Sequence, residues 1–373
     1  MKILVWQWGR RGAGPRYAAE LAASLRALPG TESVLSLSAQ SELLAEPDPP
    51  PCDLPVSTYT GMASFLRRLP AVPFQIGPLA ARIRAFAPDI AICAMPAALD
   101  LLMARALRRA KIPFLVVVHD ADIHPGDGFP LQMTLQRALV RDADGLIALT
   151  AEIGRRLHAQ KLVGDRPLIM TSLPPLTFGP TPPPPRAHGG PLRLLSFGRL
   201  LPYKGLDLLA DALRLIGPRP DMAVRVVGSG PQSPALDALR ALPGVTVENR
   251  WVPEGEVGAL LGWSDALVLS HREASQSGVA AAALAAGRWV IATRVGGITE
   301  QLSREPTARL CDPTAESLAD AILGLIASPP AHSSHDDPAA TWRQVARDLV
   351  RQVEQGWALH RPAEGGAAGP LPP

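Results

Sequence analysis

The chain has 373 residues, of which 47% are hydrophobic and only 5% aromatic, and its formal net charge is +3. This length favours about two domains with aliphatic, alanine-rich cores. The mild basicity suits an anionic ligand or a membrane surface and gives no indication of nucleic-acid binding. The three cysteines are widely separated and form no CxxC pair, so neither a disulfide framework nor a structural zinc site is expected.

The beginning of the chain, Met1-Lys-Ile-Leu-Val-Trp-Gln7, becomes polar too soon for a signal peptide, and no apolar run reaches the length of a membrane span. We therefore expect a soluble cytoplasmic protein, which could also work at the inner face of the membrane.

Short aliphatic runs alternate with helical stretches in the first half of the chain. Helices are predicted at 16–28 and 99–109, and strands at 3–6, 33–37, 90–94, 114–118, 145–149 and 168–170. Continuous aliphatic strands separated by helices are typical of a parallel sheet that is covered on both faces. Residues 1–173 are therefore predicted to form one Rossmann-like domain.

A proline-rich segment, 174–191, follows and is predicted to be a linker, because proline cannot donate hydrogen bonds to a sheet. The alternation then resumes in a second domain, 192–336, with strands at 192–196, 223–227, 245–247, 266–269 and 289–292. A helix at 337–360 could pack back on the first domain, and 361–373 is predicted to be a disordered tail. This organisation indicates an α/β fold of two doubly wound domains that face one cleft.

Two cations follow the first strand of the second domain, in Ser196-Phe-Gly-Arg-Leu-Leu-Pro-Tyr-Lys-Gly205. Arg199 and Lys204 lie between this strand end and a helix start, where they could hold a diphosphate at about 1.5–3 kcal/mol per charged hydrogen bond. The alternative is a solvated loop with a lysine near a helix cap.

The stretch Ser275-Gln-Ser-Gly278 separates a buried strand from a helix that is almost pure alanine. Its small residues could serve packing of the helix on the sheet, or the free amides of the helix start could bind an anion. We favour the second interpretation, because the turn Val226-Val-Gly-Ser-Gly-Pro231 and the two cations are expected at the same sheet edge.

Four motifs in this order resemble the donor domain of the family 4 (group 1) retaining GT-B glycosyltransferases. They are Phe197-Gly-Arg-Leu, Lys204-Gly-Leu-Asp-Leu-Leu, the glycine turn at 226–231 and the Ser-Gln-Ser-Gly helix. The resemblance extends from Leu194 to about Ile326. It implies two Rossmann-like domains and transfer of a sugar from a nucleoside diphosphate sugar to a hydroxyl acceptor, with retained configuration. A hexosyltransferase of polysaccharide or glycolipid biosynthesis is implied, and its acceptor could be a lipid-linked glycan.

The resemblance also implies roles for individual residues. Arg199, Lys204 and His119 would be catalytic. The diphosphate would contact Gly198, Arg199, Lys204, Ser275, Gln276, Ser277 and Gly278. The base and ribose would contact Gly228, Ser229, Arg250, Trp251, Val252 and Glu273. The acceptor or sugar would contact Gly12, Gly14, His119 and Asp120. For His119, a histidine held by the local backbone is the alternative.

One departure from the family pattern concerns a pair of glutamates that usually contact the donor sugar and the ribose. Ala274 and Ala282 occupy their places, and Glu273 lies one residue early. Some members of the family are similar to this chain in carrying Thr/Ser-Gln-Ser-Gly here. The departure leaves open a non-catalytic protein that binds sugar nucleotides.

Two further enzyme classes fit the sequence less well. An NAD-dependent oxidoreductase would need the third glycine that Gly228-Ser-Gly230 lacks, and a GT-B epimerase or phosphorylase is a minor alternative.

Two features of the first domain could suggest additional ligands. The two DxD patterns, at 120–122 and 142–144, lie outside the donor domain, and no metal cofactor is expected. Arginines of the first domain could contact anionic lipid, or could simply be solvated; they are Arg67, Arg68, Arg82, Arg84, Arg108, Arg109, Arg155 and Arg156.

Overall fold

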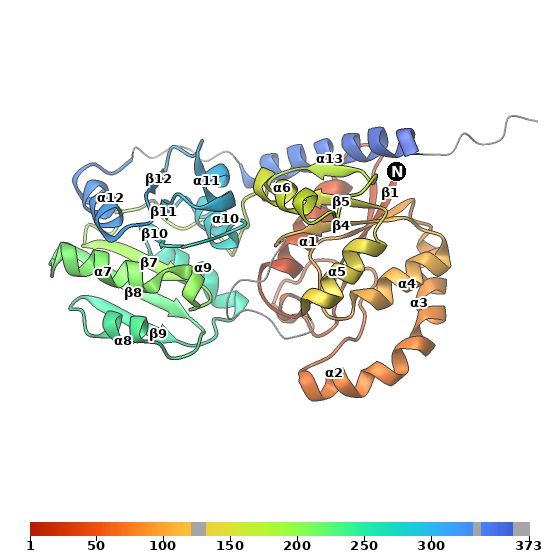
Figure 1. Cartoon of the computed structure of the whole chain (residues 1–373), viewed down its shortest axis with the longest axis horizontal. Helices are drawn as coiled ribbons and strands as arrows, with labels where there is room; N and C mark the ends of the chain where they lie inside the picture. Colours follow the sequence, from red (N-terminus) through yellow and green to blue (C-terminus); the bar gives the residue numbers. More distant parts are fainter. Residues whose placement is uncertain (121–131, 331–336, 361–373) are drawn as a thin grey trace, which may run out of the picture.

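The computed structural model describes residues 1–120, 132–330 and 337–360. They form two α/β domains, each built on a six-stranded sheet with helices on both faces (Figure 1). Every paired strand runs parallel to its neighbour. The predicted fold class, two doubly wound domains, is confirmed.

The sheet of the first domain has the order β2-β1-β3-β4-β5-β6. Its strands are β1 (Lys2–Gln7), β2 (Glu32–Leu37), β3 (Ile90–Cys93), β4 (Phe114–Val118), β5 (Gly145–Ala148) and β6 (Leu168–Met170). Its helices are α1 (Ala13–Arg26), α2 (Met62–Arg68), α3 (Val72–Phe86), α4 (Asp100–Ala110), α5 (Gln132–Asp142) and α6 (Ala151–Ala159), with short 3₁₀ turns at Glu42–Ala45 and Leu69–Ala71. The strand order reverses between β1 and β3.

The sheet of the second domain has the order β12-β11-β10-β7-β8-β9 and reverses between β7 and β10. Its strands are β7 (Leu192–Phe197), β8 (Met222–Gly228), β9 (Val245–Asn249), β10 (Ala266–Leu269), β11 (Trp289–Thr293) and β12 (Ala308–Cys311). Its helices are α7 (Leu206–Ile216), α8 (Pro234–Arg240), α9 (Glu254–Trp263), α10 (Gly278–Ala285), α11 (Gly296–Leu302) and α12 (Ala315–Ala327), and Pro202–Lys204 is a 3₁₀ turn.

Alternate residues of the strands in the second domain enter two separate apolar cores. Leu194, Val226 and Val268 belong to the core on one face of the sheet, whereas Leu195 and Val227 belong to the core on the other face. Since both faces are covered, both sets of alternate positions are apolar, which explains the continuous aliphatic runs in the sequence.

The edge strand β12 was not predicted from the sequence. It pairs with β11 alone, and three of its four residues are only half-buried. An edge strand with one neighbour needs no continuous apolar run, so its pattern is weak.

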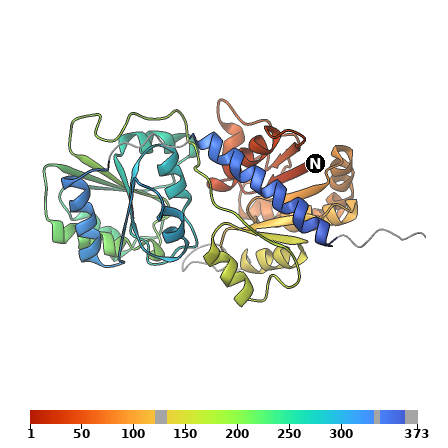
Figure 2. The same cartoon turned by 90° about the horizontal axis from the view of Figure 1, so that it is seen from above.

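The last helix, α13 (Pro338–His360), lies across the first domain, as the view from above shows (Figure 2). Trp342 is buried in the core of that domain, and its ring lies 5.3 Å from the ring of Tyr17 on α1. Its Nε1 donates to the carbonyl of Pro175, 2.7 Å away. The chain thus returns from the second domain to complete the core of the first. Of the helices described, none is long and apolar enough to cross a membrane.

Buried Asp100 generates a prediction about stability. Its Oδ2 accepts from the amide nitrogen of Ala97 at 2.6 Å, and burial raises the pKa of this carboxyl to about 7. Between about pH 4 and this pKa the unfolded carboxyl is ionised while the folded one keeps its proton, so the free energy of unfolding falls by about 1.4 kcal/mol per pH unit as the pH rises.

Asp100→Asn is therefore expected to abolish this fall in urea-unfolding measurements between pH 5 and 7. Asp320→Asn, at an exposed position on α12, is the matched control and should keep it. An Asp100→Asn protein with the pH dependence of the wild type would contradict the assignment.

Candidate active site

The strand order of the second domain reverses between β7 and β10, and ligands of doubly wound sheets bind outside the carboxyl ends of the strands at such a point. A pocket lies there. It is lined by the end of β7, by the turn after it and by the end of β10. Its lining residues are Ser196, Phe197, Arg199, Leu200, Lys204, Leu206, Val268, Leu269, Ser270 and His271.

The two predicted cations come together in this pocket around one aromatic ring. The guanidinium carbon of Arg199 lies 5.8 Å from the centroid of the Tyr203 ring, and Nζ of Lys204 lies 5.3 Å from it. Both cations are therefore within cation–π distance of the same ring. The arrangement concentrates positive charge at the carboxyl edge of the sheet.

His271 is a further member of this cluster that the sequence interpretation did not assign. It is buried, and its Nε2 lies 2.8 Å from Nζ of Lys204. When Lys204 is an ammonium it donates, so Nε2 of His271 accepts. The only sequence signal for His271 is its place two residues after the end of β10.

Close backbone contacts fix the turns that carry these side chains. Gly205 has φ +63°, and a Cβ built on it would lie 1.9 Å from the carbonyl oxygen of Ser270. A Cβ built on Gly228, at the end of β8, would lie 1.6 Å from the carbonyl oxygen of Gly198. The glycine turn after β8 is thus required for backbone packing against the turn after β7.

The stretch 275–278 forms the beginning of α10. Ser277 is the N-cap residue, and its Oγ accepts from the amide of Ala280 at 3.2 Å. The amide of Ser277 donates to Oε1 of Gln301 on α11. Among the described residues, the first two amides of the helix, those of Gly278 and Val279, have no protein acceptor. The donors available to an anion are therefore those of Gly278 and Val279.

The buried serine and glutamine before the helix have different neighbours. The carbonyl of Ser275 accepts from Oγ1 of Thr150 in the first domain. Gln276 is 7% exposed and lines a cavity of about 270 Å³ between the two domains, together with Glu300, Gln301 and residues 172–175, where the first domain passes into the linker.

The glycine-rich segment of the first domain meets the start of α10. A Cβ built on Gly278 would lie 3.5 Å from Cβ of Ala13, and one built on Gly198 would lie 3.5 Å from a methyl group of Val279. Gly12 caps the beginning of α1 and is exposed, whereas Gly14 is buried against the side chain of Gln7. Two helix starts, one from each domain, thus converge beside the cationic pocket.

The segment predicted to contact base and ribose lies at the end of β9. Arg250 is engaged by two carboxylates, those of Glu248 at 3.1 Å and Glu256 at 2.8 Å. The ring of Trp251 is 38% exposed and lies 5.0 Å from the guanidinium of Arg11, in the first domain. Val252 is buried, and Ser229 accepts from the amide of Leu200 through its carbonyl.

The positions of the missing glutamates are buried and small. Ala274 and Ala282 are 3% and 2% exposed and belong to one apolar core of the second sheet. Glu273 is exposed. Nothing at these two alanines can hydrogen-bond a sugar or ribose through its side chain.

His119 follows β4 at the carboxyl edge of the first sheet. Its Nδ1 lies 2.9 Å from Oδ2 of Asp120, and both side chains are about one quarter exposed. A carboxylate at Nδ1 favours the proton on that nitrogen, so that Nε2 can accept. The partner is thus a neighbouring carboxylate and not the local backbone.

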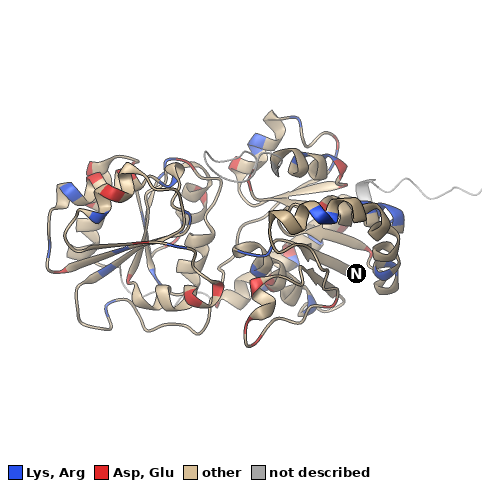
Figure 3. Cartoon of the chain, turned by 90° about the horizontal axis from the view of Figure 1, so that it is seen from below, with Lys and Arg blue, Asp and Glu red and all other residues tan. Residues whose placement is uncertain are grey.

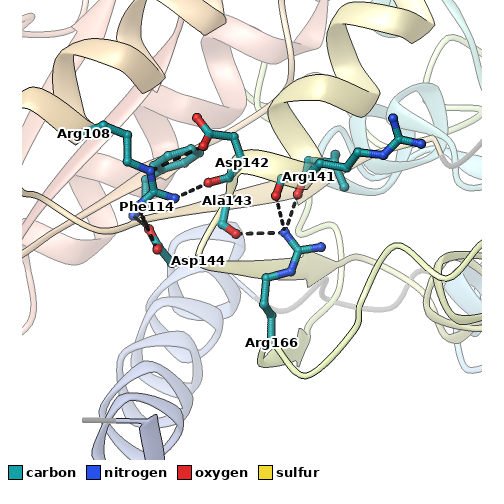
Figure 4. Close-up of polar contacts among 8 residues, drawn as sticks. Arg108, Phe114, Arg141, Asp142, Ala143, Asp144 and Arg166 are labelled. Carbon is teal, nitrogen blue, oxygen red and sulfur yellow. Dashed lines mark hydrogen bonds and ion pairs between the residues drawn. The ribbon is translucent and has the colours of Figure 1, made fainter. Parts of the chain in front are cut away.

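The DxD pattern at 142–144 is occupied by an arginine. Nη1 of Arg108 lies 2.8 Å from Oδ1 of Asp144, and Nε of the same guanidinium lies 3.5 Å from Oδ1 of Asp142 (Figure 4). Asp144 also accepts from the amide of Phe114. Asp122 of the other pattern lies outside the described residues. Within the described part of the chain, no group of three His, Cys, Asp or Glu residues could hold a metal ion.

Polar contacts join the two domains next to the site. Nε of Arg16 on α1 lies 2.6 Å from Oε1 of Glu254 on α9, and these side chains are only 15% and 5% exposed. Burial raises the pKa of Glu254, and Arg16 opposes that rise. The carboxylate of Glu300 on α11 accepts from the amide of Ala151, the first residue of α6.

Two family models match the chain, one in each domain. Residues 12–172 match the glycosyl transferase 4-like domain, and residues 191–328 match the glycosyl transferases group 1. The chain belongs to a GT-B glycosyltransferase family. The matches favour neither an oxidoreductase nor a non-catalytic binding protein.

Relatives agree with this glycosyltransferase assignment. A D-inositol 3-phosphate glycosyltransferase of Jonesia denitrificans is 27% identical over 236 residues, which are 55% of this chain and 55% of that protein. The chain thus matches about half the length of this relative. A sucrose-phosphate synthase from Thermosynechococcus elongatus has a TM-score of 0.68 at 16% identity, and the match covers 96% of this chain and 99% of that one.

The Anabaena protein Alr3699/HepE, solved in complex with UDP and glucose, has a TM-score of 0.61 at 18% identity over 96% of this chain and 99% of that one. At such identities these solved structures show the shared GT-B fold.

The buried Arg16–Glu254 ion pair generates a prediction about the contact between the two domains. Glu254→Gln removes the nearer of the two carboxylates that pair with Arg16 and leaves only Glu46 of the first domain, at 3.2 Å. Removing one partner of a buried ion pair costs up to about 3–5 kcal/mol. We expect the variant to relieve this cost by separating the two domains, which small-angle X-ray scattering would detect as a larger radius of gyration.

The matched control is Glu152→Gln, which removes an ion pair with Arg155 of the same 2.6 Å length from within one helix. It should scatter like the wild type. A Glu254→Gln protein with wild-type scattering would contradict a role of this pair in holding the domains together.

Proposed function

We propose that this protein transfers a sugar from a nucleoside diphosphate sugar to a hydroxyl acceptor, with retention of anomeric configuration. The observation that carries the proposal is that Arg199 and Lys204 line one pocket where the second sheet reverses, while the beginning of α10 lies beside the same turn, next to Gly198. These groups are what a leaving diphosphate needs, namely fixed cations and free helix-start amides.

Each group has a defined part in this proposal. Arg199 and Lys204 neutralise the charge that builds on the leaving diphosphate in an oxocarbenium-like transition state. The amides of Gly278 and Val279 share that charge, aided by the helix dipole at about 0.3–1 kcal/mol. The contact from Lys204 to His271 orients the ammonium.

The acceptor is proposed to bind from the first domain. His119 lies at the carboxyl edge of that sheet, and Asp120 holds its Nδ1, so Nε2 would accept from a hydroxyl of the transferred sugar or the acceptor. Exposed Gly12 at the start of α1 would border the same space. No protein nucleophile is assigned, and the acceptor hydroxyl attacks on the face from which the diphosphate departs.

We also propose that the reaction needs no metal ion. The diphosphate is neutralised by side chains and amides, and the only DxD pattern that lies wholly within the described residues is occupied by Arg108. The acceptor class proposed is a lipid-linked glycan of polysaccharide or glycolipid assembly, which a hexosyltransferase would meet at the inner face of a membrane. The UDP and glucose in the Anabaena structure support a sugar nucleotide as donor.

Calorimetric titration of UDP, GDP and NADH in the presence of EDTA tests the donor site. We expect one nucleoside diphosphate to bind and Lys204→Ala to weaken its binding about 10- to 100-fold, because a charged hydrogen bond contributes about 1.5–3 kcal/mol. Lys2→Ala, which removes a lysine far from the site, is the matched control and should bind like the wild type.

Equal affinity in the Lys204→Ala protein would contradict the placement of the diphosphate. Binding that appears only after manganese replaces EDTA would contradict the metal-independent proposal. Binding of NADH alone would contradict the donor class.

A further inference from the structure

The first domain exposes an apolar stripe on α2 and the turn that follows it. Met62, Leu66 and Leu69 are 59%, 56% and 43% exposed, and Phe74 at the start of α3 is 82% exposed. The spacing of the first three residues, i, i+4 and i+7, places them on one face of the helix. These four are the majority of the large exposed hydrophobic residues in the described part of the chain.

The stripe does not belong to the core of the domain. No residue of α2 is buried, whereas the neighbouring α3 buries Leu79, Ala80 and Ile83 against the sheet. A surface helix of a globular protein normally turns its apolar face toward the core. An apolar stripe that faces solvent therefore indicates an interaction surface. In Figure 1, α2 projects from the side of the first domain.

The charge around the stripe has one sign. Between Asp53 and Asp89 the sequence contains four arginines, Arg67, Arg68, Arg82 and Arg84, and no Asp or Glu. The view from below, the side to which α2 projects, shows basic positions along this helix pair (Figure 3). Among the described residues, no carboxylate forms an ion pair with any of the four.

Three arginines elsewhere in the first domain differ in this respect. Arg108 is paired with Asp142 and Asp144, and Arg155 and Arg156 are both paired with Glu152. These three arginines are therefore compensated locally. The four arginines of the segment that carries the exposed apolar stripe have no such local compensation among the described residues.

A chain of ring contacts connects this segment to the site. The ring of Phe65 on α2 lies 5.4 Å from the ring of Tyr59, and the guanidinium of Arg10 lies 5.4 Å from the same tyrosine ring. Arg10 belongs to the glycine-rich segment that leads into α1. The apolar stripe is thus adjacent to the end of the cleft where the acceptor is proposed to bind.

We propose that α2 and α3 form a docking surface for an anionic lipid bilayer. Met62, Leu66, Leu69 and Phe74 would enter the interface between headgroups and acyl chains, while Arg67, Arg68, Arg82 and Arg84 contact lipid phosphates. The docking surface deepens the proposed function and rests on one part of it, namely that the acceptor is linked to a lipid. Binding to lipid itself requires no sugar transfer.

Co-sedimentation with vesicles tests the surface. Vesicles of phosphatidylcholine alone are compared with vesicles that contain about one third phosphatidylglycerol, at low and high salt. We expect binding to the anionic vesicles only, weakened by salt. Leu66→Ser/Phe74→Ser should lower the partition constant by at least about tenfold, and Arg67→Glu/Arg82→Glu by at least about fivefold per arginine.

Matched controls lie in the second domain. Leu215→Ser replaces a leucine that is also 59% exposed, and Arg304→Glu reverses an exposed arginine. Both should partition like the wild type. All variants should keep wild-type affinity for the nucleoside diphosphate, so that a defect at the surface is distinguished from a defect at the donor site.

Three outcomes would overturn the docking surface. One is wild-type partitioning of the Leu66→Ser/Phe74→Ser protein, and another is equal binding to neutral and anionic vesicles. The third is a wild-type protein that is dimeric and does not bind vesicles, together with a Leu66→Ser/Phe74→Ser protein that is monomeric. The stripe would then be an interface between copies of the chain. A Lys204→Ala protein that loses nucleotide binding and keeps vesicle binding would support both proposals, because it would show that the donor site and the lipid surface are separate.

Discussion

The proposed donor site depends on close backbone contacts between glycine-containing turns at the carboxyl edge of the second sheet. The turns after β7, β8 and β10 approach so closely that a Cβ on Gly205 or Gly228 would overlap a carbonyl oxygen of the neighbouring turn. This nesting brings Lys204 to His271 and holds Arg199 and Lys204 around Tyr203. Because the turns are fixed by their neighbours, the cations are positioned before any ligand arrives, which lowers the reorganisation needed for charge stabilisation.

The first domain contacts the second beside this site. The start of α1 meets the start of α10, and the Arg16–Glu254 pair joins α1, which follows the glycine-rich segment, to α9, which follows β9. Helix α13 begins after the second domain and completes the core of the first through Trp342. The two domains are thereby coupled by charge on one side and by the returning chain on the other. Exclusion of water strengthens the electrostatic contacts within such a cleft.

Much of the fold could be predicted because aliphatic strands that are buried on both faces leave continuous runs in the sequence, as at 114–118 and 192–196. Arg199 and Lys204 could be predicted as candidates because cations after a strand end are visible in one short segment, and the structure places both in one pocket. The edge strand β12 was missed since it lacks such a run. The contacts of His271 with Lys204 and of Arg16 with Glu254 join residues 67 and 238 positions apart, so only the folded chain reveals them. The same holds for Asp142 and Asp144, whose pattern suggests a metal signature although Arg108 neutralises them.

The most direct test of the central claim is release of nucleoside diphosphate from a panel of UDP- and GDP-sugars, with and without an extract of lipid-linked glycans. The account predicts that one donor is consumed, that the lipid fraction accelerates its consumption, and that Arg199→Ala/Lys204→Ala abolishes it in a protein that still folds. Binding of a donor with no release under any of these conditions would contradict it. The buried alanines at 274 and 282 would then mark a GT-B protein that holds sugar nucleotides without transferring the sugar.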